Sequence, residues 1–251
     1  MTDQEIVRAK LKLIKMSTAR NELAGLLRES QENQSLPLDF LDQVLESELK
    51  GREKKRIQIR IKQAEFPVKK TLSDFDFSRI PGLNKMKILD YYDGSFIDKK
   101  ENLIFIGNSG TGKTHLSIAI ALGQCLKNSR VWFTTGAGLI NKLNEAKNEK
   151  FLLKFFAQAK KLDLVVIDEV GYFPYEKTES ELLFQYISER YERGSLIITT
   201  NLPFSKWNEI FYSERLTTAI LDRLIHFCQI IEMNGESYRF SQSLKSKEDN
   251  K

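Results

Sequence analysis

Hydrophobic and polar positions divide the chain into two parts with different periodicities. Through residues 1–66 apolar side chains recur at helical spacing, as Val7, Leu11 and Ile14 do, and no segment alternates like a strand. The residue before a proline is disfavoured in the helical conformation, so the last of these helices is expected to end before Pro67. The pattern predicts a small all-α N-terminal domain over residues 1–66.

The rest of the chain, residues 67–251, has the pattern of an α/β domain. Short apolar runs alternate with helical segments, which is typical of a parallel sheet with right-handed crossovers. The predicted strands are 102–107, 130–134, 163–168, 195–200 and 226–232. The predicted helices are 112–127, 137–160 with an interruption, 178–193 and 215–224. We expect a five-stranded parallel sheet flanked by helices, organised as a lead-in segment (67–101), a core (102–240) and a polar tail (241–251).

Composition limits the classes of protein that the chain can belong to. Its 251 residues are 41% hydrophobic and 29% charged, which is ordinary for a globular protein. No apolar run approaches the ~20 residues that span a bilayer, and the acidic, polar start does not resemble a signal peptide. We therefore expect a cytoplasmic protein with no membrane partner. Cys125 and Cys228 are isolated and are expected to be reduced, and with only His115 and His226 a zinc site is not expected.

Positive charge is concentrated in residues 50–62. The chain has a net charge of +5, whereas this segment alone holds seven basic residues against one acidic residue, a net charge of +6. Such a run is either a solvated helix face or a helix that contacts nucleic-acid phosphates. The candidate DNA-binding residues are Arg52, Lys54, Lys55, Arg56, Arg60 and Lys62.

The strongest chemical signal lies between residues 107 and 114, which match the phosphate-loop pattern G-x-x-x-x-G-K-[ST]. An apolar, β-branched run precedes the loop and a helix follows it, so consecutive backbone N–H groups would point at the β-phosphate. Lys113 is expected to reach the β- and γ-phosphates, and the Thr114 hydroxyl to hold Mg²⁺. The candidate residues for binding ATP or GTP are Gly107, Asn108, Ser109, Gly110, Thr111, Gly112, Lys113, Thr114 and His115.

A pair of carboxylates follows the apolar run 164–167. At the C-terminal edge of a parallel strand, Asp168 would face the Mg²⁺ site directly or through water. Glu169 can then polarise the water that attacks the γ-phosphate. An acidic pair can also end a strand for solubility, but beside a phosphate loop we favour catalysis. A kinase would need a pocket for an acceptor hydroxyl here, so the pair indicates hydrolysis.

Another polar strand end is formed by Thr199, Thr200 and Asn201. The Asn201 amide, on a strand beside the one that carries Asp168, can orient the attacking water and sense the γ-phosphate. The alternative is that Asn201 only starts a turn before Pro203. Next to the two motifs above we favour the sensor.

Several further blocks resemble a known family. They are Ala64 to Pro67, Leu72 to Phe77, Gly107 to His115, Ile167 to Tyr172, Leu183 to Arg193, Ile198 to Phe204, Ala219 to His226 and Gly235 to Arg239. Together they resemble the AAA+ P-loop NTPases and, within them, the IstB-like transposition helper proteins, which are related to the DnaC-type helicase loaders.

The resemblance implies roles that spacing alone does not. It implies that the protein is an AAA+ ATPase that uses ATP and Mg²⁺ and is expected to lack the usual helical lid domain. Arg223 matches the family's arginine finger, which reaches the nucleotide of a neighbouring subunit. Arg239 matches the second-sensor arginine, which touches the γ-phosphate of its own subunit. The catalytic candidates are Lys113, Asp168, Glu169, Asn201, Arg223 and Arg239.

Two functions remain open on this resemblance. The first is an ATPase that forms a homo-oligomer with ATP on double-stranded DNA and stimulates a transposase. The second is a helicase loader that binds single-stranded DNA. The basic segment at residues 50–62 has no aromatic residues for stacking on unpaired bases, which favours the transposition helper.

Overall fold

The computed structural model describes residues 2–235, and the chain divides into two compact units at Ile59 and Arg60. The predicted boundary after residue 66 lies further along the chain. The segment between the two positions belongs to the second unit because it joins the sheet there. The carbonyl of Ala64 accepts a hydrogen bond of 2.8 Å from the Phe133 N–H, and Ala64 is fully buried.

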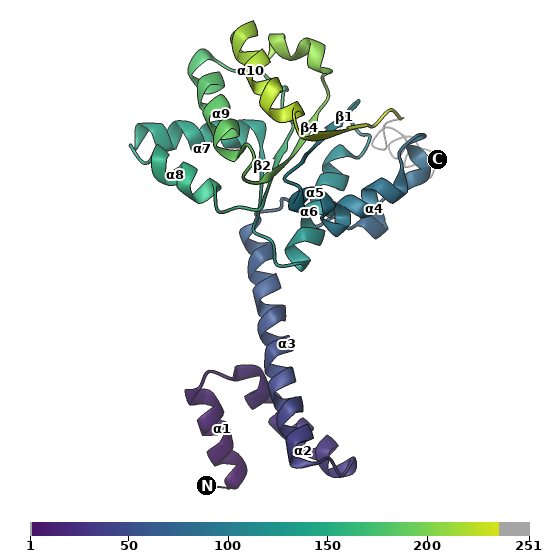
Figure 1. Cartoon of the computed structure of the whole chain (residues 1–251), viewed down its shortest axis with the longest axis vertical. Coiled ribbons are helices and arrows are strands. Elements are labelled where there is room, and N and C mark those ends of the chain that lie inside the picture. Colours follow the sequence, from purple (N-terminus) through teal and green to yellow (C-terminus); the bar gives the residue numbers. More distant parts are fainter. Residues whose placement is uncertain (1, 236–251) are drawn as a thin grey trace, which may run out of the picture. The chain divides into compact units, whose positions relative to one another are not determined.

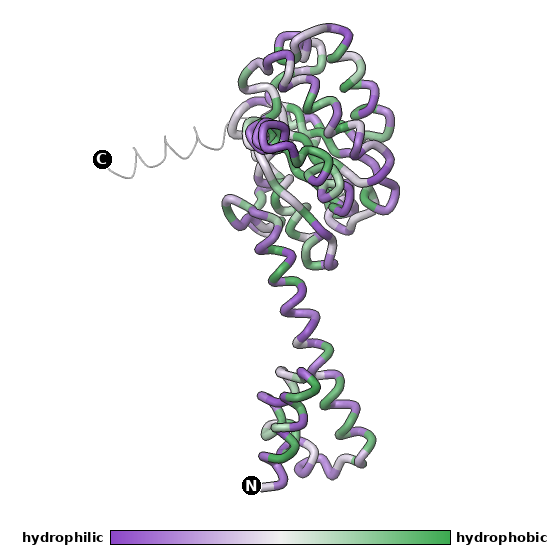
Figure 2. Tube along the Cα trace, turned by 90° about the vertical axis from the view of Figure 1, so that its left-hand side faces the viewer, coloured by the Kyte–Doolittle hydropathy of each residue, from purple (hydrophilic) through white to green (hydrophobic). Residues whose placement is uncertain are grey.

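The first unit is helical, as predicted. It contains α1 (Asp3–Leu13), α2 (Ser17–Glu32) and the greater part of α3 (Pro37–Gln63). Its core is small, and its buried apolar side chains are Leu11, Ala19, Leu23 and Val44. Other leucines of α3 remain exposed: Leu38, Leu41, Leu45 and Leu49. Figure 2 shows this mixed character as alternating hydrophobic and hydrophilic stretches along the helices.

One buried carboxylate organises the first unit. Glu48 of α3 is only 4% exposed and accepts hydrogen bonds from the backbone N–H groups of Thr18 (2.8 Å) and Ala19 (3.1 Å), in the first turn of α2. No side chain at the preceding N-cap position caps this helix, so Glu48 supplies the acceptor that its unpaired N–H groups need. Arg52, one turn along α3, pairs with Glu48 at 2.8 Å.

The second unit contains the predicted five-stranded sheet, with every strand parallel to its neighbours. The strand order is β2-β3-β4-β1-β5. The strands are β1 (Asn102–Ile106), β2 (Val131–Thr135), β3 (Leu164–Asp168), β4 (Ser195–Thr200) and β5 (Cys228–Glu232). Each predicted strand is confirmed to within two residues at either end.

Helices cover both faces of the sheet (Figure 1). One face packs against α4 (Lys85–Asp93), α5 (Ser95–Asp98) and α6 (Lys113–Leu126). The other packs against α7 (Gly136–Asn148), α8 (Leu152–Ala159), α9 (Lys177–Arg190) and α10 (Glu214–Ile225). The interruption expected within 137–160 falls between α7 and α8.

Side-chain alternation along the strands decides which face each polar strand end occupies. Val166 of β3 and Ile197 of β4 point to the α6 face, whereas Ile167 and Ile198 point to the opposite face. Because side chains of a strand alternate, residues 168 and 199 return to the α6 face. The two strands pair in parallel with Ile167 opposite Ile198, so positions 168 and 199 are neighbours at the C-terminal edge.

The lead-in segment has more regular structure than its sequence pattern predicts. Besides α4 and α5 it contains two short 3-10 helices, η1 (Leu72–Asp74) and η2 (Phe77–Arg79); a third, η3 (Phe204–Glu209), follows β4. These elements are too short for a helical period to be visible in the sequence. Among residues 2–235, no helix is both long and apolar enough to cross a membrane. The predicted tail at 241–251 lies outside the described residues.

The capping role of Glu48 leads to a prediction. Burial raises its pKa, but hydrogen bonds from Arg52, Ala19 and Thr18 outweigh this effect, so the folded pKa is below the ordinary value of 4.5. Glu48→Gln should therefore destabilise the first unit by about 1–3 kcal/mol at neutral pH. The deficit relative to wild type should be complete above pH 4.5 and should vanish as the pH falls through the lowered pKa.

Helical circular dichroism during urea unfolding at a series of pH values measures this difference. Glu53→Gln, an exposed change on the same helix, is the matched control and should resemble wild type throughout. Equal unfolding of the Glu48→Gln and Glu53→Gln proteins at neutral pH would contradict the capping role.

Candidate nucleotide-binding site

The phosphate loop joins the end of β1 to the first turn of α6, as the sequence predicted. Gly112 is the N-cap of α6 and has a φ of 91°, a left-handed conformation that side chains rarely adopt. A Cβ added there would lie 2.7 Å from the Phe75 ring, so the close packing of the loop also requires glycine. The first turn of α6, residues 113–115, lines the pocket, and the N-terminus of a helix is where an anion is favoured.

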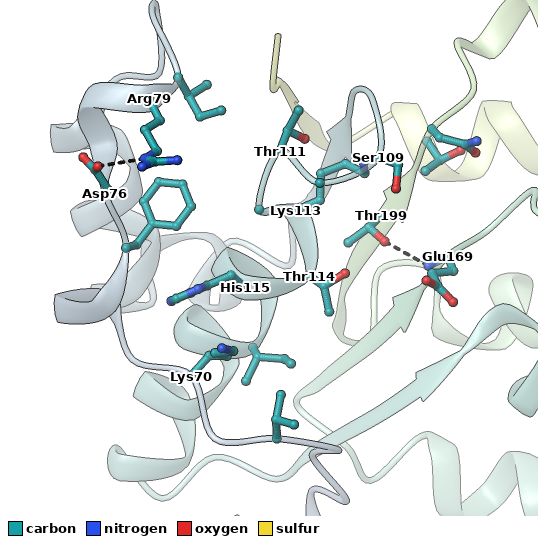
Figure 3. A pocket seen from close by; sticks show the side chains of 18 of the residues that line it. Lys70, Asp76, Arg79, Ser109, Thr111, Lys113, Thr114, His115, Glu169 and Thr199 are labelled. Atoms are coloured by element: carbon teal, nitrogen blue, oxygen red, sulfur yellow. Dashed lines mark hydrogen bonds and ion pairs between the residues drawn. The ribbon is translucent and has the colours of Figure 1, made fainter. Parts of the chain in front are cut away.

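Two side chains of the loop, Thr111 and Lys113, hydrogen-bond to the backbone of the loop itself. The Thr111 hydroxyl donates to the Asn108 carbonyl at 2.9 Å, and Thr111 is 3% exposed. The Lys113 ammonium donates to the carbonyls of Gly107 (2.7 Å) and Asn108 (2.8 Å). Figure 3 shows Lys113 in the middle of the pocket, between the residues of its two walls. The ammonium therefore lies across the loop that is predicted to hold the phosphates.

The predicted Mg²⁺ ligands are brought together. The Thr114 hydroxyl donates to Asp168 Oδ1 at 3.0 Å, although the residues are 54 positions apart. Burial raises the pKa of the Asp168 carboxyl, against hydrogen bonds from Thr199 and Thr114 and the charge of Lys113. A cation beside this carboxylate would favour its ionised form. No group of three or more metal-ligating side chains occurs in the described part of the chain, so Mg²⁺ would also need phosphate oxygens and water.

Glu169 and Asn201 line the same pocket. Glu169 is exposed and has a φ of 59°, an uncommon conformation for a residue other than glycine. Its backbone N–H donates to the Thr199 hydroxyl at 2.9 Å (Figure 3). Asn201 Oδ1 is buried and accepts no hydrogen bond from the described residues. A carboxylate and an amide that can each bind a water molecule therefore share one cavity with the phosphate loop.

The wall of the pocket that faces Glu169 and Thr199 was not predicted from the sequence. The cavity has a volume of about 700 Å³, and its lead-in wall consists of Val68, Lys70, Asp74, Phe75, Asp76, Arg79 and Ile80. Figure 3 shows Asp76 and Arg79 across the pocket from Glu169 and Thr199. The wall provides apolar side chains and charged ones, which suits a base and a sugar.

Two contacts hold this wall against the phosphate loop. His115 Nε2 is 2.8 Å from the Thr71 carbonyl oxygen, and the Phe75 ring packs edge-on against the His115 ring with centroids 5.4 Å apart. The signal in the sequence is the block Leu72 to Phe77, which carries the family resemblance but has no chemical pattern of its own.

Arg223 is not brought to the pocket of its own chain. It lies on α10, where its Nη1 donates to the Ala219 carbonyl at 3.0 Å and its guanidinium lies 4.5 Å from the centroid of the Phe184 ring. It is absent from the residues that line the nucleotide pocket within the described chain. Its role as a finger stays a prediction. Arg239 lies outside the described residues.

The six candidate DNA contacts fall into two groups. Three already bind partners within their own units: Arg52 with Glu48 (2.8 Å), Lys55 with Ser17 Oγ (2.7 Å) and Arg60 with Asn128 Oδ1 (3.3 Å). The others are exposed and make no hydrogen bond or ion pair with described residues: Lys54, Arg56 and Lys62. The second group is therefore the better candidate for phosphate contacts.

Comparison with known proteins identifies a family. The family model described as "IstB-like ATP binding protein" matches residues 7–246. A protein of insertion sequence IS232 from Bacillus thuringiensis subsp. berliner is 34% identical over 95% of this chain and 96% of its own length. A protein of insertion sequence IS21 from Pseudomonas aeruginosa is 34% identical over 98% of this chain and 92% of its own length. The name of each relative describes an ATP-binding protein of its insertion sequence, assigned by expectation.

Solved structures show the same fold. The crystal structure of DnaI superposes with a TM-score of 0.55 and 21% identity, covering 65% of this chain and 90% of that chain. DnaA from Aquifex aeolicus, solved with AMPPCP bound, superposes with a TM-score of 0.56 and 19% identity, covering 74% of this chain and 56% of that one. The predicted AAA+ P-loop fold is confirmed.

Lys113 provides a direct test of the pocket. Lys113→Ala should weaken ATP binding by about tenfold to hundredfold, because a lost hydrogen bond to a charged group costs about 1.5–3 kcal/mol. Isothermal titration with ATP and Mg²⁺ measures the Kd, and Lys87→Ala, an exposed lysine elsewhere in the second unit, is the control. Unchanged ATP affinity in the folded Lys113→Ala protein would place the nucleotide elsewhere.

Proposed function

The chain belongs to the family of IstB-like ATP-binding proteins, and from this premise we propose that it hydrolyses ATP to assist DNA transposition. The observation that carries the hydrolytic part is that the phosphate loop, Thr114 and Glu169 line one cavity, with Asp168 hydrogen-bonded to Thr114 directly behind it. The transposition part is supported by relatives from insertion sequences that match nearly end to end.

Each candidate has a distinct task in hydrolysis. Lys113 and the backbone of the loop bind the phosphates. Thr114 and Asp168 would hold Mg²⁺, which neutralises phosphate charge as negative charge moves toward the leaving group. Glu169 acts as the general base for the attacking water, and Asn201 orients that water against the γ-phosphate. Asn201 suits this task because it lines the same cavity as the phosphate loop and Glu169.

We propose that Arg223 acts as an arginine finger between subunits. Within one chain, residues 109–114 of the phosphate loop and Glu169 line the nucleotide pocket, whereas Arg223 lies on α10 and lines other surfaces. A second copy that presents Arg223 to this pocket would complete the charge stabilisation that phosphoryl transfer needs. This arrangement supports a homo-oligomer that forms with ATP, and hydrolysis would then promote its disassembly.

DNA and a transposase are the proposed partners, and the cytoplasm is the proposed location. The exposed cations of α3 can contact duplex phosphates without reading sequence. The leucines that α3 leaves exposed, such as Leu38 and Leu49, support a protein partner as well.

Helicase loading remains the second candidate because the sequence resembles the DnaC-type loaders as well. The similarity to the solved structure of DnaI is at 21% identity and concerns the fold alone, whereas the insertion-sequence relatives are at 34% identity. The kind of DNA that the protein binds separates the two candidates.

Glu169→Gln tests hydrolysis. The substitution keeps the size of the side chain and removes the base, so turnover should fall by about 10²–10⁴-fold while ATP binding is retained. Phosphate release measures turnover with duplex DNA present, and size-exclusion chromatography should show an oligomer that persists with ATP. Glu181→Gln, an exposed carboxylate change on α9, is the control. Turnover near the wild-type rate would remove Glu169 from its role.

Substituting the exposed cations of α3 tests DNA binding. Replacing Lys54, Arg56 and Lys62 by alanine removes up to three phosphate contacts, each of which contributes about 0.9 to the slope of log affinity against log salt. The slope for duplex DNA should therefore flatten by up to about 2.7. A matched triple variant at exposed lysines elsewhere should keep the wild-type slope: Lys87, Lys99 and Lys154.

Fluorescence anisotropy with duplex and single-stranded oligonucleotides, with ATP present, measures both slopes. An unchanged duplex slope in the first variant would show that these cations are only a solvated helix face. A clear preference of the wild type for single strands would favour helicase loading over transposition.

A further inference from the structure

Thr199, at the tip of β4, contacts both carboxylate residues of the site. It is 1% exposed, and the alternation of side chains along β4 places it on the same face of the sheet as Asp168. We infer that Thr199 is the positioning residue that sets Asp168 and Glu169 in their working geometry. The inference rests on the proposed ATP hydrolysis and adds a residue to it.

The Thr199 hydroxyl uses both of its hydrogen-bonding capacities. It donates to Asp168 Oδ1, the same oxygen that accepts from Thr114. It also accepts from the backbone N–H of Glu169 at 2.9 Å. One hydroxyl can make these two bonds at once, and no apolar side chain can make either. The Asp168 carboxylate and the backbone of Glu169 are thereby both hydrogen-bonded to the Thr199 hydroxyl.

The backbone at Glu169 needs such a restraint. Its φ of 59° lies in the left-handed region, which costs free energy for a residue with a side chain and persists only where neighbouring contacts hold it. The Thr199 carbonyl accepts from the Val170 N–H at 2.9 Å, so Thr199 holds two consecutive N–H groups of this turn. Of these two bonds only the one from Glu169 depends on the side chain.

The two bonds have separable consequences for catalysis. Losing the bond to Asp168 removes one of the donors to a buried carboxylate, which should weaken the hold on Mg²⁺. Losing the bond from Glu169 frees the turn that aims the base at the water, and a displacement of about 1 Å can cost about a hundredfold in rate. ATP itself would be bound mainly by the phosphate loop, whereas the hydrogen bonds of the Thr199 side chain go to Asp168 and Glu169.

The test is Thr199→Val, which keeps the shape of the side chain and removes the hydroxyl. In the full chain with duplex DNA, kcat should fall by about tenfold to hundredfold. The Kd for ATP without Mg²⁺ should stay within about threefold of wild type, and half-saturation by Mg²⁺ should move to higher concentration. Thr199→Ser keeps the hydroxyl and should restore most of the rate.

Ser195→Ala is the matched control, because Ser195 is a fully buried hydroxyl at the other end of β4 that bonds to the Phe96 carbonyl at 3.3 Å. Its kcat and Mg²⁺ dependence should match wild type. Circular dichroism checks folding, and Thr199→Ala replaces Thr199→Val if the valine protein does not fold.

Three results would overturn the inference. They are a kcat for Thr199→Val within about twofold of wild type, an equal loss in the Ser195→Ala protein, and failure of Thr199→Ser to recover the rate. Failure of the proposed function looks different, because then the wild-type protein itself would not hydrolyse ATP under these conditions.

Discussion

A buried carboxylate in a parallel sheet must find donors, and that constraint organises the site of this protein. Asp168 is 4% exposed, and its Oδ1 accepts from hydroxyls on α6 and on β4. An unpaired carboxylate in this position would carry a large desolvation penalty. The two bonds therefore join β3, the phosphate-loop helix and the strand that leads to Asn201. The relative placement of Thr114, Asp168 and Thr199 follows from the hydrogen bonds to this one oxygen atom.

Much of this arrangement was predictable because it depends on periodicity. Strands buried on both faces have continuous apolar runs, and their polar ends mark the edge of the sheet where residues 168 and 201 were expected. The phosphate loop was predictable because its backbone geometry requires glycine at fixed positions, as Gly112 shows. The role inferred for Thr199 was not predictable, since it depends on the register between β3 and β4 and on a turn with positive φ at Glu169.

Two features could not be predicted from the sequence: the lead-in wall of the pocket and the partners of the cations on the basic helix α3. The wall is built from irregular segments and two short 3-10 helices, which leave no period in the sequence. The places of residues such as Lys70 and Arg79 at the pocket are therefore known only from the structure. In the basic helix, charge alone does not distinguish a cation that holds the fold from one that is exposed. Arg52 has a partner because Glu48 is buried beside α2, whereas Arg56 has none among the described residues. The sequence shows the same positive charge for both.

The wall has a thermodynamic consequence. Its residues come from the segment that directly follows α3, and this segment is held on the loop by the contacts of Thr71 and Phe75 with His115. A ligand that touches both walls binds only the docked segment, so by linkage it stabilises docking by RT ln(1 + [L]/Kd), about 2.7 kcal/mol at a hundred times Kd. If ATP touches both walls, nucleotide binding and docking of the lead-in segment are coupled equilibria, and the ATP concentration would set how strongly residues 71–75 are held on the phosphate loop.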